Sequence, residues 1–250
     1  MIWNEALRTR ARHLGLYGLL EHEQQAEIHW VEPLLAWEED ARAQRSMDRR
    51  LKASHLGQFK SISDFDWNWP KKCDRMAIEE AMNLDFLQKS GNIILRGPNG
   101  VGKTMVAKNL AYQALISGHT ALFTTAAEML GYLGATDSDS LLRSRIKHYA
   151  TPTLLVIDEV GYLSYSNRYA DLLFAVVNKR YEQRSTIITT NRPFQEWSEI
   201  FPSASCVVSL IDRLTHHADY IDIQAESYRF KESQEEAAIK KQRRNKKAGV

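Results

Sequence analysis

The sequence predicts an α/β fold in which a parallel, five-stranded sheet flanked by helices follows a small N-terminal helical domain. Two observations carry this prediction. Short apolar runs recur through residues 92–223, and the segments between them are long enough for the crossover helices that parallel strands need. Residues 1–60, by contrast, are charged and have almost no strand pattern. We therefore expect a ligand site at the carboxyl ends of the strands.

The composition indicates an ordinary globular protein. The chain has 250 residues and a formal net charge of +2, so it can bury one substantial core and is no polycation. Its apolar runs are too short to cross a bilayer, and the N-terminus lacks a secretory signal, so we expect a cytoplasmic protein with no membrane partner. Cys73 and Cys206 have no CxxC partner, which predicts reduced, structural thiols.

The N-terminal segment, residues 1–60, predicts three helices. An apolar stripe of leucines interrupted by glycines indicates a short helix, a turn and a second helix. A longer helix is expected from Pro33, because proline is favoured in a first turn and no glycine follows before Gly57. Its predicted buried side consists of Leu34, Trp37 and Ala41.

Four cations follow on this long helix at offsets of three, four and three, which places them on one face: Arg42, Arg45, Arg49 and Lys52. That face could contact the phosphate backbone of DNA. It could equally be a solvated surface paired with Glu38, Glu39 and Asp48. Charge alone leaves both interpretations open.

Residues 61–72 predict an extended linker, and residues 73–230 form the predicted main domain. Phe65, Trp67 and Trp69 alternate in the linker, where they either pin it against the main domain or stack on a base of a nucleotide or DNA. The main domain is expected to begin with a helix over Cys73–Leu87. Its apolar side is predicted from the spacing of Met76, Glu80, Leu84 and Leu87.

The rest of the main domain alternates strands with helices. The predicted strands are Asn92–Leu95, Thr120–Thr124, Thr153–Ile157, Thr186–Thr189 and Tyr220–Ile223. Residues 231–250 form a basic tail, which we expect to be a frayed helix or disordered. Such a tail could attract nucleic acid, but a solubilising terminus would have the same composition.

A glycine loop after the first strand carries the most specific motif. Residues 95–104 read Leu-Arg-Gly-Pro-Asn-Gly-Val-Gly-Lys-Thr and fit GxxxxGK[S/T], between an apolar strand and a helical pattern. Glycines let successive amides turn inward around a polyphosphate, helped by the N-terminus of the next helix. Lys103 would supply a cation to the β- and γ-phosphates, and Thr104 a hydroxyl to Mg²⁺. The predicted ATP contacts are Gly97, Pro98, Asn99, Gly100, Val101, Gly102, Lys103, Thr104 and Met105.

Two adjacent carboxylates follow the third predicted strand. Asp158 would hold Mg²⁺, directly or through water, and Glu159 would polarise the water that attacks the γ-phosphate. A kinase with the same loop must exclude that water, so Glu159 favours hydrolysis over transfer to a small-molecule acceptor. Two exposed acids at a strand end are the alternative interpretation.

Three further side chains could complete the site. Asn191 follows the fourth strand and could bind the attacking water or the γ-phosphate, although asparagine is also a common turn residue. Arg213, which projects away from the apolar face of its predicted helix, and Arg229 could stabilise the transferring phosphoryl group; each could equally be a surface ion pair. His216 and His217 are adjacent and cannot both point the same way from a helix, so no metal site other than that of nucleotide-bound Mg²⁺ is expected.

These motifs, taken in order, resemble the IstB-like ATPases of insertion-sequence transposition, which are similar to the DnaC helicase loaders of the AAA+ superfamily. The matching runs are Gly-Pro-Asn-Gly-Val-Gly-Lys-Thr, Leu-Leu-Val-Ile-Asp-Glu-Val-Gly-Tyr-Leu, Ser-Thr-Ile-Ile-Thr-Thr-Asn-Arg-Pro-Phe, Ile-Asp-Arg-Leu and Glu-Ser-Tyr-Arg. The resemblance covers nearly the whole chain except the tail.

The resemblance implies roles for individual residues. Lys103 and Thr104 would be the Walker A pair, Asp158 and Glu159 the Walker B pair, and Asn191 the first sensor. Arg213 would reach the ATP of a neighbouring subunit, and Arg229 would be the second sensor.

It also implies an ATP-dependent homo-oligomer on double-stranded DNA that presents the target to a partner transposase, with ATP and Mg²⁺ as cofactors. The alternative is a helicase loader whose N-terminal helices bind a replicative helicase.

Overall fold

The computed structural model describes residues 3–136, 138–162, 167–201 and 205–237, and the chain divides into two compact units, Met1–Lys52 and Ala53–Val250. This division lies before residue 60, where the sequence placed the end of the helical domain. The residues after Ala53 belong to the second unit because they are bonded to it. The carbonyl of Ser54 accepts from the amide of Phe123, and the carbonyl of Leu56 accepts from the ammonium of Lys108.

The first unit contains helices α1 (Glu5–His13), α2 (Tyr17–Glu21) and most of α3 (Ile28–Ala53). The side chain of Asn4 caps α1 by accepting from the amide of Leu7 at 2.8 Å. The unit has a small apolar core of its own, made of Trp3, Leu7, Ala11, Leu14, Ala26, Val31 and Leu35.

The predicted buried side of the long helix is wrong. Helix α3 begins at Ile28, ahead of Pro33, and its buried residues are Val31 and Leu35. Trp37 is 68% exposed and Leu34 lies at the surface. The prediction failed because it began the helix at the proline, and so assigned the wrong residues to the side that packs against the core.

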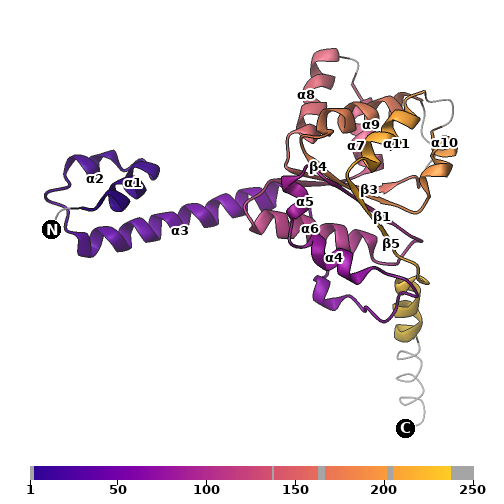
Figure 1. Cartoon of the computed structure of the whole chain (residues 1–250), viewed down its shortest axis with the longest axis horizontal. Coiled ribbons are helices and arrows are strands. Elements are labelled where there is room, and N and C mark those ends of the chain that lie inside the picture. The colour runs from indigo at the N-terminus through magenta and orange to yellow at the C-terminus, as the bar shows by residue number, and fades with distance from the viewer. Residues whose placement is uncertain (1–2, 137, 163–166, 202–204, 238–250) are drawn as a thin grey trace, which may run out of the picture. The chain divides into compact units, whose positions relative to one another are not determined.

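The second unit is built on a parallel sheet, as predicted (Figure 1). The strands are β1 (Asn92–Arg96), β2 (Ala121–Thr125), β3 (Leu154–Val160), β4 (Ser185–Thr190) and β5 (Ala218–Asp222). Their order is β2-β3-β4-β1-β5, and every neighbouring pair is parallel. All five strands were therefore located from the sequence. Strand β4 lies between β1 and β3, which brings the carboxyl ends of these three strands together.

Helices cover both faces of the sheet (Figure 1). One face carries α6 (Lys103–Ile116) and α4 (Arg75–Ala81); the other carries α7 (Ala126–Gly134), α9 (Asn167–Arg180) and α11 (Val207–Thr215). Helix α8 (Asp139–Ala150) packs against α9. Short turns of helix lie at α5 (Asp85–Gln88), α10 (Trp197–Ile200), η1 (Ile62–Asp64) and η2 (Phe194–Glu196).

The single helix predicted over Cys73–Leu87 is wrong. The structure has two helices, α4 and α5, separated at Leu84, which adopts a left-handed conformation with φ of 66°. Met76 is 80% exposed, while Ile78 and Ala81 are buried. A helical repeat in the sequence does not reveal a backbone reversal at a leucine, because leucine rarely adopts positive φ.

The C-terminal part of the second unit continues past β5 as a helix over residues 228–237. The rest of the predicted basic tail, including the cluster from Lys240 to Lys247, lies outside the described residues. Within the described ranges, no helix is both long and apolar enough to cross a membrane.

Candidate active site

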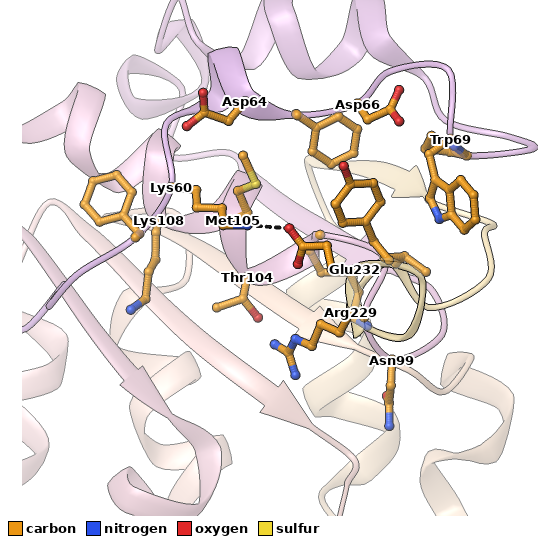
Figure 2. Close-up of a pocket in the computed structure, with 18 of the residues that line it drawn as sticks. Lys60, Asp64, Asp66, Trp69, Asn99, Thr104, Met105, Lys108, Arg229 and Glu232 are labelled. Atoms are coloured by element: carbon orange, nitrogen blue, oxygen red, sulfur yellow. Dashed lines mark hydrogen bonds and ion pairs between the residues drawn. The ribbon is translucent and has the colours of Figure 1, made fainter. Parts of the chain in front are cut away.

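A cavity of about 540 Å³ lies beside the glycine loop at the carboxyl edge of the sheet. Its walls come from four places: the glycine loop with the start of α6, the aromatic segment (residues 58–70), the end of β3, and the helix that begins at residue 228 (Figure 2). The volume is typical of a small-molecule site.

The glycine loop is packed so closely that side chains would not fit. A Cβ atom on Gly97 would collide with the carbonyl oxygen of Ile223. Gly102 has φ of 97°, and a Cβ there would lie 2.5 Å from the ring of Phe65. The amide of Tyr228 also donates to the carbonyl of Gly100 at 3.0 Å. The loop is thus held in its conformation by segments on both sides.

Lys103 begins α6 and is only 4% exposed. Its ammonium donates to the carbonyls of Gly97 and Pro98, both at 2.7 Å, so it is folded over the loop. Burial lowers the pKa of Lys103 to about 8, against the opposing effect of the nearby carboxylates Asp158 and Glu159. A charge so poorly solvated is well suited to bind phosphate.

Asp158 meets Thr104 at the end of β3. The Thr104 hydroxyl donates to the Asp158 carboxylate, with oxygen separations of 3.0 and 3.1 Å, and Asp158 is 3% exposed. The hydroxyl of Thr189 on β4 also donates to this carboxylate. Thr104 and Asp158 together offer oxygen donors of the kind that Mg²⁺ prefers.

Glu159 occupies a bulge in β3. The register against β4 shifts between Ile157 and Val160, and Glu159 has φ of 63° with an exposed side chain that lines the cavity. Its amide donates to the hydroxyl of Thr189 at 2.9 Å. Bulges and positive φ values at such residues often redirect a side chain at a functional site. Here the result is that two adjacent acids have different surroundings, one buried and one open to the cavity.

Asn191 follows β4, the strand that lies between β1, which leads into the glycine loop, and β3, which carries the two acids. Its side-chain oxygen is buried and has no hydrogen-bond partner among the described residues. Asn191 does not itself line the cavity. Its place after β4 nevertheless brings an amide to the edge where Thr104 and Asp158 meet.

The sequence of the chain matches the model of one protein family, described as IstB-like ATP binding protein, over residues 14–236. The chain belongs to this family. It is 34% identical over 239 residues to a Pseudomonas aeruginosa protein named as an ATP-binding protein of insertion sequence IS21, covering 94% of this chain and 90% of the relative. It is 33% identical over 229 residues to the corresponding IS232 protein of Bacillus thuringiensis subsp. berliner, covering 90% and 91%.

The fold of this IstB-like protein is also found in solved structures. The crystal structure of DnaI superposes with a TM-score of 0.55 at 21% identity, covering 68% of this chain and 92% of DnaI. The predicted AAA+ fold is thereby confirmed, while the low identity carries no further conclusion.

The two arginines of the IstB-like protein lie in different places. Arg229 lines the cavity and points toward Thr104 (Figure 2). Arg213, on α11, is not part of the cavity wall; it donates to the side-chain oxygen of Asn178 on α9, and its guanidinium lies 4.7 Å from the ring centroid of Phe174. The structure therefore brings Arg229, but not Arg213, to the site of its own chain.

The aromatic segment is pinned to the glycine loop and to the helix over residues 228–237, within the second unit. Phe65 packs on Gly102 and lies tilted against Trp67 with the ring centroids 4.6 Å apart, and Trp69 meets the ring of Tyr228 edge-on at 5.8 Å. Two ion pairs join the segment to the helix after residue 228: Lys60 with Glu232 at 2.7 Å, and Lys231 with Asp66 at 3.3 Å (the first is drawn in Figure 2). Of the two interpretations of the aromatics, pinning accounts for these contacts.

The basic face of α3 is partly neutralised within the first unit. Arg42 and Arg45 both contact Glu38, at 2.6 and 3.1 Å. Arg49 and Lys52 are exposed and have no carboxylate partner within the described ranges of the chain. Glu39 and Asp48, the other expected partners, instead contact Arg10 and Gln44.

Two residues that the sequence did not single out support the site. The hydroxyl of Thr189 donates to the Asp158 carboxylate and accepts from the backbone amide of Glu159. Asn109, on α6, accepts from the amide of Ile62 and donates to the carbonyl of Lys60, both at 2.9 Å. The only signal for Thr189 was its place in an apolar strand that ends in polar residues. No sequence pattern distinguished Asn109 from its neighbours on the predicted helix.

Proposed function

We propose that this IstB-like protein hydrolyses ATP and, as an ATP-dependent homo-oligomer on double-stranded DNA, regulates the partner transposase of an insertion sequence. One observation carries the ATPase proposal. Glu159 is turned into the cavity by a bulge while its neighbour Asp158 stays buried on Thr104. This arrangement separates a carboxylate for a metal ion from a carboxylate for water.

Each residue has a distinct task in the proposed reaction. Lys103 and the loop amides hold the β- and γ-phosphates of ATP. Glu159 accepts a proton from water as the water oxygen bonds to the γ-phosphorus and the bond to the ADP oxygen breaks. Asn191, at the same edge of the sheet but outside the cavity wall, would turn its side-chain amide to donate to the water or to the γ-phosphate. Thr104 and Asp158 would hold Mg²⁺, which would supply positive charge to the phosphate oxygens.

The proposed DNA contact is the α3 face of Arg42, Arg45, Arg49 and Lys52. Cations on one helical face bind the phosphate backbone without reading sequence. Within this face, Arg49 and Lys52 should contribute most, because Glu38 already neutralises part of the charge of Arg42 and Arg45.

Relatives favour transposition over helicase loading as the setting. The relatives at 33% and 34% identity cover most of both chains and are named for insertion sequences. The alternative, a helicase loader, rests on the resemblance of the sequence motifs to the DnaC helicase loaders. The full chain, immobilised with ATP, should retain the transposase of its own element; retention of a replicative helicase in its place would favour the alternative.

The DNA proposal is tested by titrating labelled duplex DNA with the full chain in ATP, in ADP and without nucleotide. Tight binding is expected in ATP but not in ADP or without nucleotide. This binding should weaken steeply as the salt concentration rises, because cation contacts release counterions from the DNA. A double variant, Arg49→Ala with Lys52→Ala, should bind more weakly and with a smaller salt slope. The matched control is Arg143→Ala with Lys147→Ala on α8, which also removes two exposed cations one turn apart. Equal effects of both double variants, or binding indifferent to nucleotide, would contradict the proposal.

A further inference from the structure

Three potential metal ligands meet at the edge of the sheet opposite the cavity. Glu182 lies in the turn between α9 and β4, while His216 and His217 lie between α11 and β5. The carbonyl of His217 accepts from the amide of Asn92, the first residue of β1, which places the group at the amino ends of the strands. All three side chains are exposed. None of them takes part in the proposed ATP hydrolysis.

Adjacent histidines diverge on a helix, but His216 and His217 lie after the end of one. Helix α11 ends at Thr215, His216 is extended, and His217 has φ of 59°. The two imidazole centroids consequently lie only 3.7 Å apart. Glu182, itself at φ of 55°, comes within 3.8 Å of the Nδ1 atom of His216.

We propose that Glu182, His216 and His217 bind a transition-metal ion of the zinc type. One potential ligand atom from each lies within 4.8 Å of the other two. Ligands at the usual distance from zinc are about 3.4 Å apart, so modest rotation of exposed side chains suffices. Two imidazoles and one carboxylate leave a fourth position for water, and this donor set suits zinc, cobalt or nickel better than Mg²⁺. The hydroxyl of Tyr181 contacts Nδ1 of His216 at 2.8 Å and orients that ring.

The proposed ion would join the turn after α9 to the end of α11. These are the two helices between which Arg213 is held, through Asn178 and through the rings of Phe174 and Tyr181. Tyr181 contacts both Arg213 and His216, so the proposed site and the arginine share a support. We infer that the bound ion stiffens the packing that positions Arg213. Binding of the ion is independent of whether the cavity hydrolyses ATP, whereas its effect on Arg213 rests on the proposed function.

The test uses the full chain without a polyhistidine tag and without nucleotide, because both the tag and the nucleotide would bind metal ions. Titration with Co²⁺ should give a visible absorption band typical of four-coordinate cobalt that saturates at one ion per chain, and added Zn²⁺ should abolish the band. Zn²⁺ should also raise the melting temperature, because Glu182 joins the two histidines only in the folded chain. Absence of the band and of the melting shift would overturn the proposal.

Variants assign the site. His217→Ala and Glu182→Gln should each weaken Co²⁺ binding about tenfold or more, since even outer-shell changes at metal sites have effects of that size. The matched control is His29→Ala, which removes an exposed histidine paired at 3.0 Å with a single carboxylate, Glu27. All three positions are exposed, so circular dichroism should be unchanged. If His29→Ala lost the band, or His217→Ala and Glu182→Gln kept it, the assignment would be wrong.

Discussion

The buried ammonium of Lys103 makes phosphate binding depend on pH. Its pKa is about 8 because burial disfavours the charged form, whereas contact with a triphosphate favours that form. ATP affinity should therefore be steady below neutral pH and should fall as pH rises through 8, by up to about tenfold per pH unit. Equilibrium binding of a fluorescent ATP analogue across this range measures the effect. Lys103→Arg should bind with no such decline, because a guanidinium stays charged; wild-type affinity that is constant up to high pH would contradict this account.

Thr189 is the residue whose role the structure adds to the motifs. Thr189→Val keeps the shape of the side chain but leaves the Asp158 carboxylate and the Glu159 amide without this buried partner. We expect a loss of about 1–3 kcal/mol in the free energy of unfolding and a lower ATP turnover rate.

Thr189→Ser retains the hydroxyl and should preserve both quantities. The measurements are denaturant unfolding and steady-state phosphate release. Turnover by Thr189→Val equal to that of the wild type would show that this hydroxyl does not position the acids.

The contrast between Thr189 and Thr104 explains how much of the site the sequence could predict. Thr104 and Lys103 belong to a contiguous motif whose spacing is fixed by the phosphate that it binds. The importance of Thr189 depends on β4 pairing with β3, and that of Asn109 on where the aromatic segment returns to α6. Such contacts between distant residues leave no local pattern in the chain.

Asn109 clamps the aromatic segment to α6. Asn109→Ala should release residues 58–70 from that helix, and ATP should bind more weakly because Phe59 and Phe65 line the cavity. We expect the free energy of unfolding to fall by about 1–3 kcal/mol, because the Ile62 amide and the Lys60 carbonyl lose their partner. Hydrogen exchange at Ile62 should become faster.

Asn109→Asp serves as the graded control because it keeps the acceptor for the Ile62 amide and loses the donor to the Lys60 carbonyl. It should fall between the wild type and Asn109→Ala in both ATP affinity and exchange rate. Unchanged exchange at Ile62 in Asn109→Ala would show that the clamp is not needed.

The elements themselves were predictable where burial dominates. Strands β1 to β4 are short, buried apolar runs and were located from the sequence. The edge strand β5 was also located, although only Ile221 in it is buried. Helices with one exposed face were harder to predict. Helix α3 begins before its proline, and the backbone reverses at Leu84 between α4 and α5. Both features depend on packing against neighbours, which a helical repeat does not encode.

The position of Arg213 outside the cavity leads us to expect that a second copy of the chain completes the active site. Arg213 lies outside the cavity of its own chain, held on α9 by Asn178 and Phe174. Arg213→Ala should bind ATP normally and hydrolyse it slowly, whereas Lys103→Ala should fail to bind ATP. Mixing the two inactive variants should restore turnover, because junctions then form that pair an intact cavity with an intact arginine. A mixture as inactive as its components would rule out the action of Arg213 on a neighbouring subunit.

In the proposed reaction, Glu159 activates water at a site where Lys103, Thr104 and Asp158 hold Mg²⁺-ATP. Phosphate release by the full chain with Mg²⁺, ATP and duplex DNA, compared between the wild type and Glu159→Gln, tests it most directly. The wild type should turn over repeatedly, and the variant should bind ATP with similar affinity while releasing phosphate about a hundredfold more slowly or less. Equal rates in the two proteins, or no release by a wild type that binds ATP, would contradict the account.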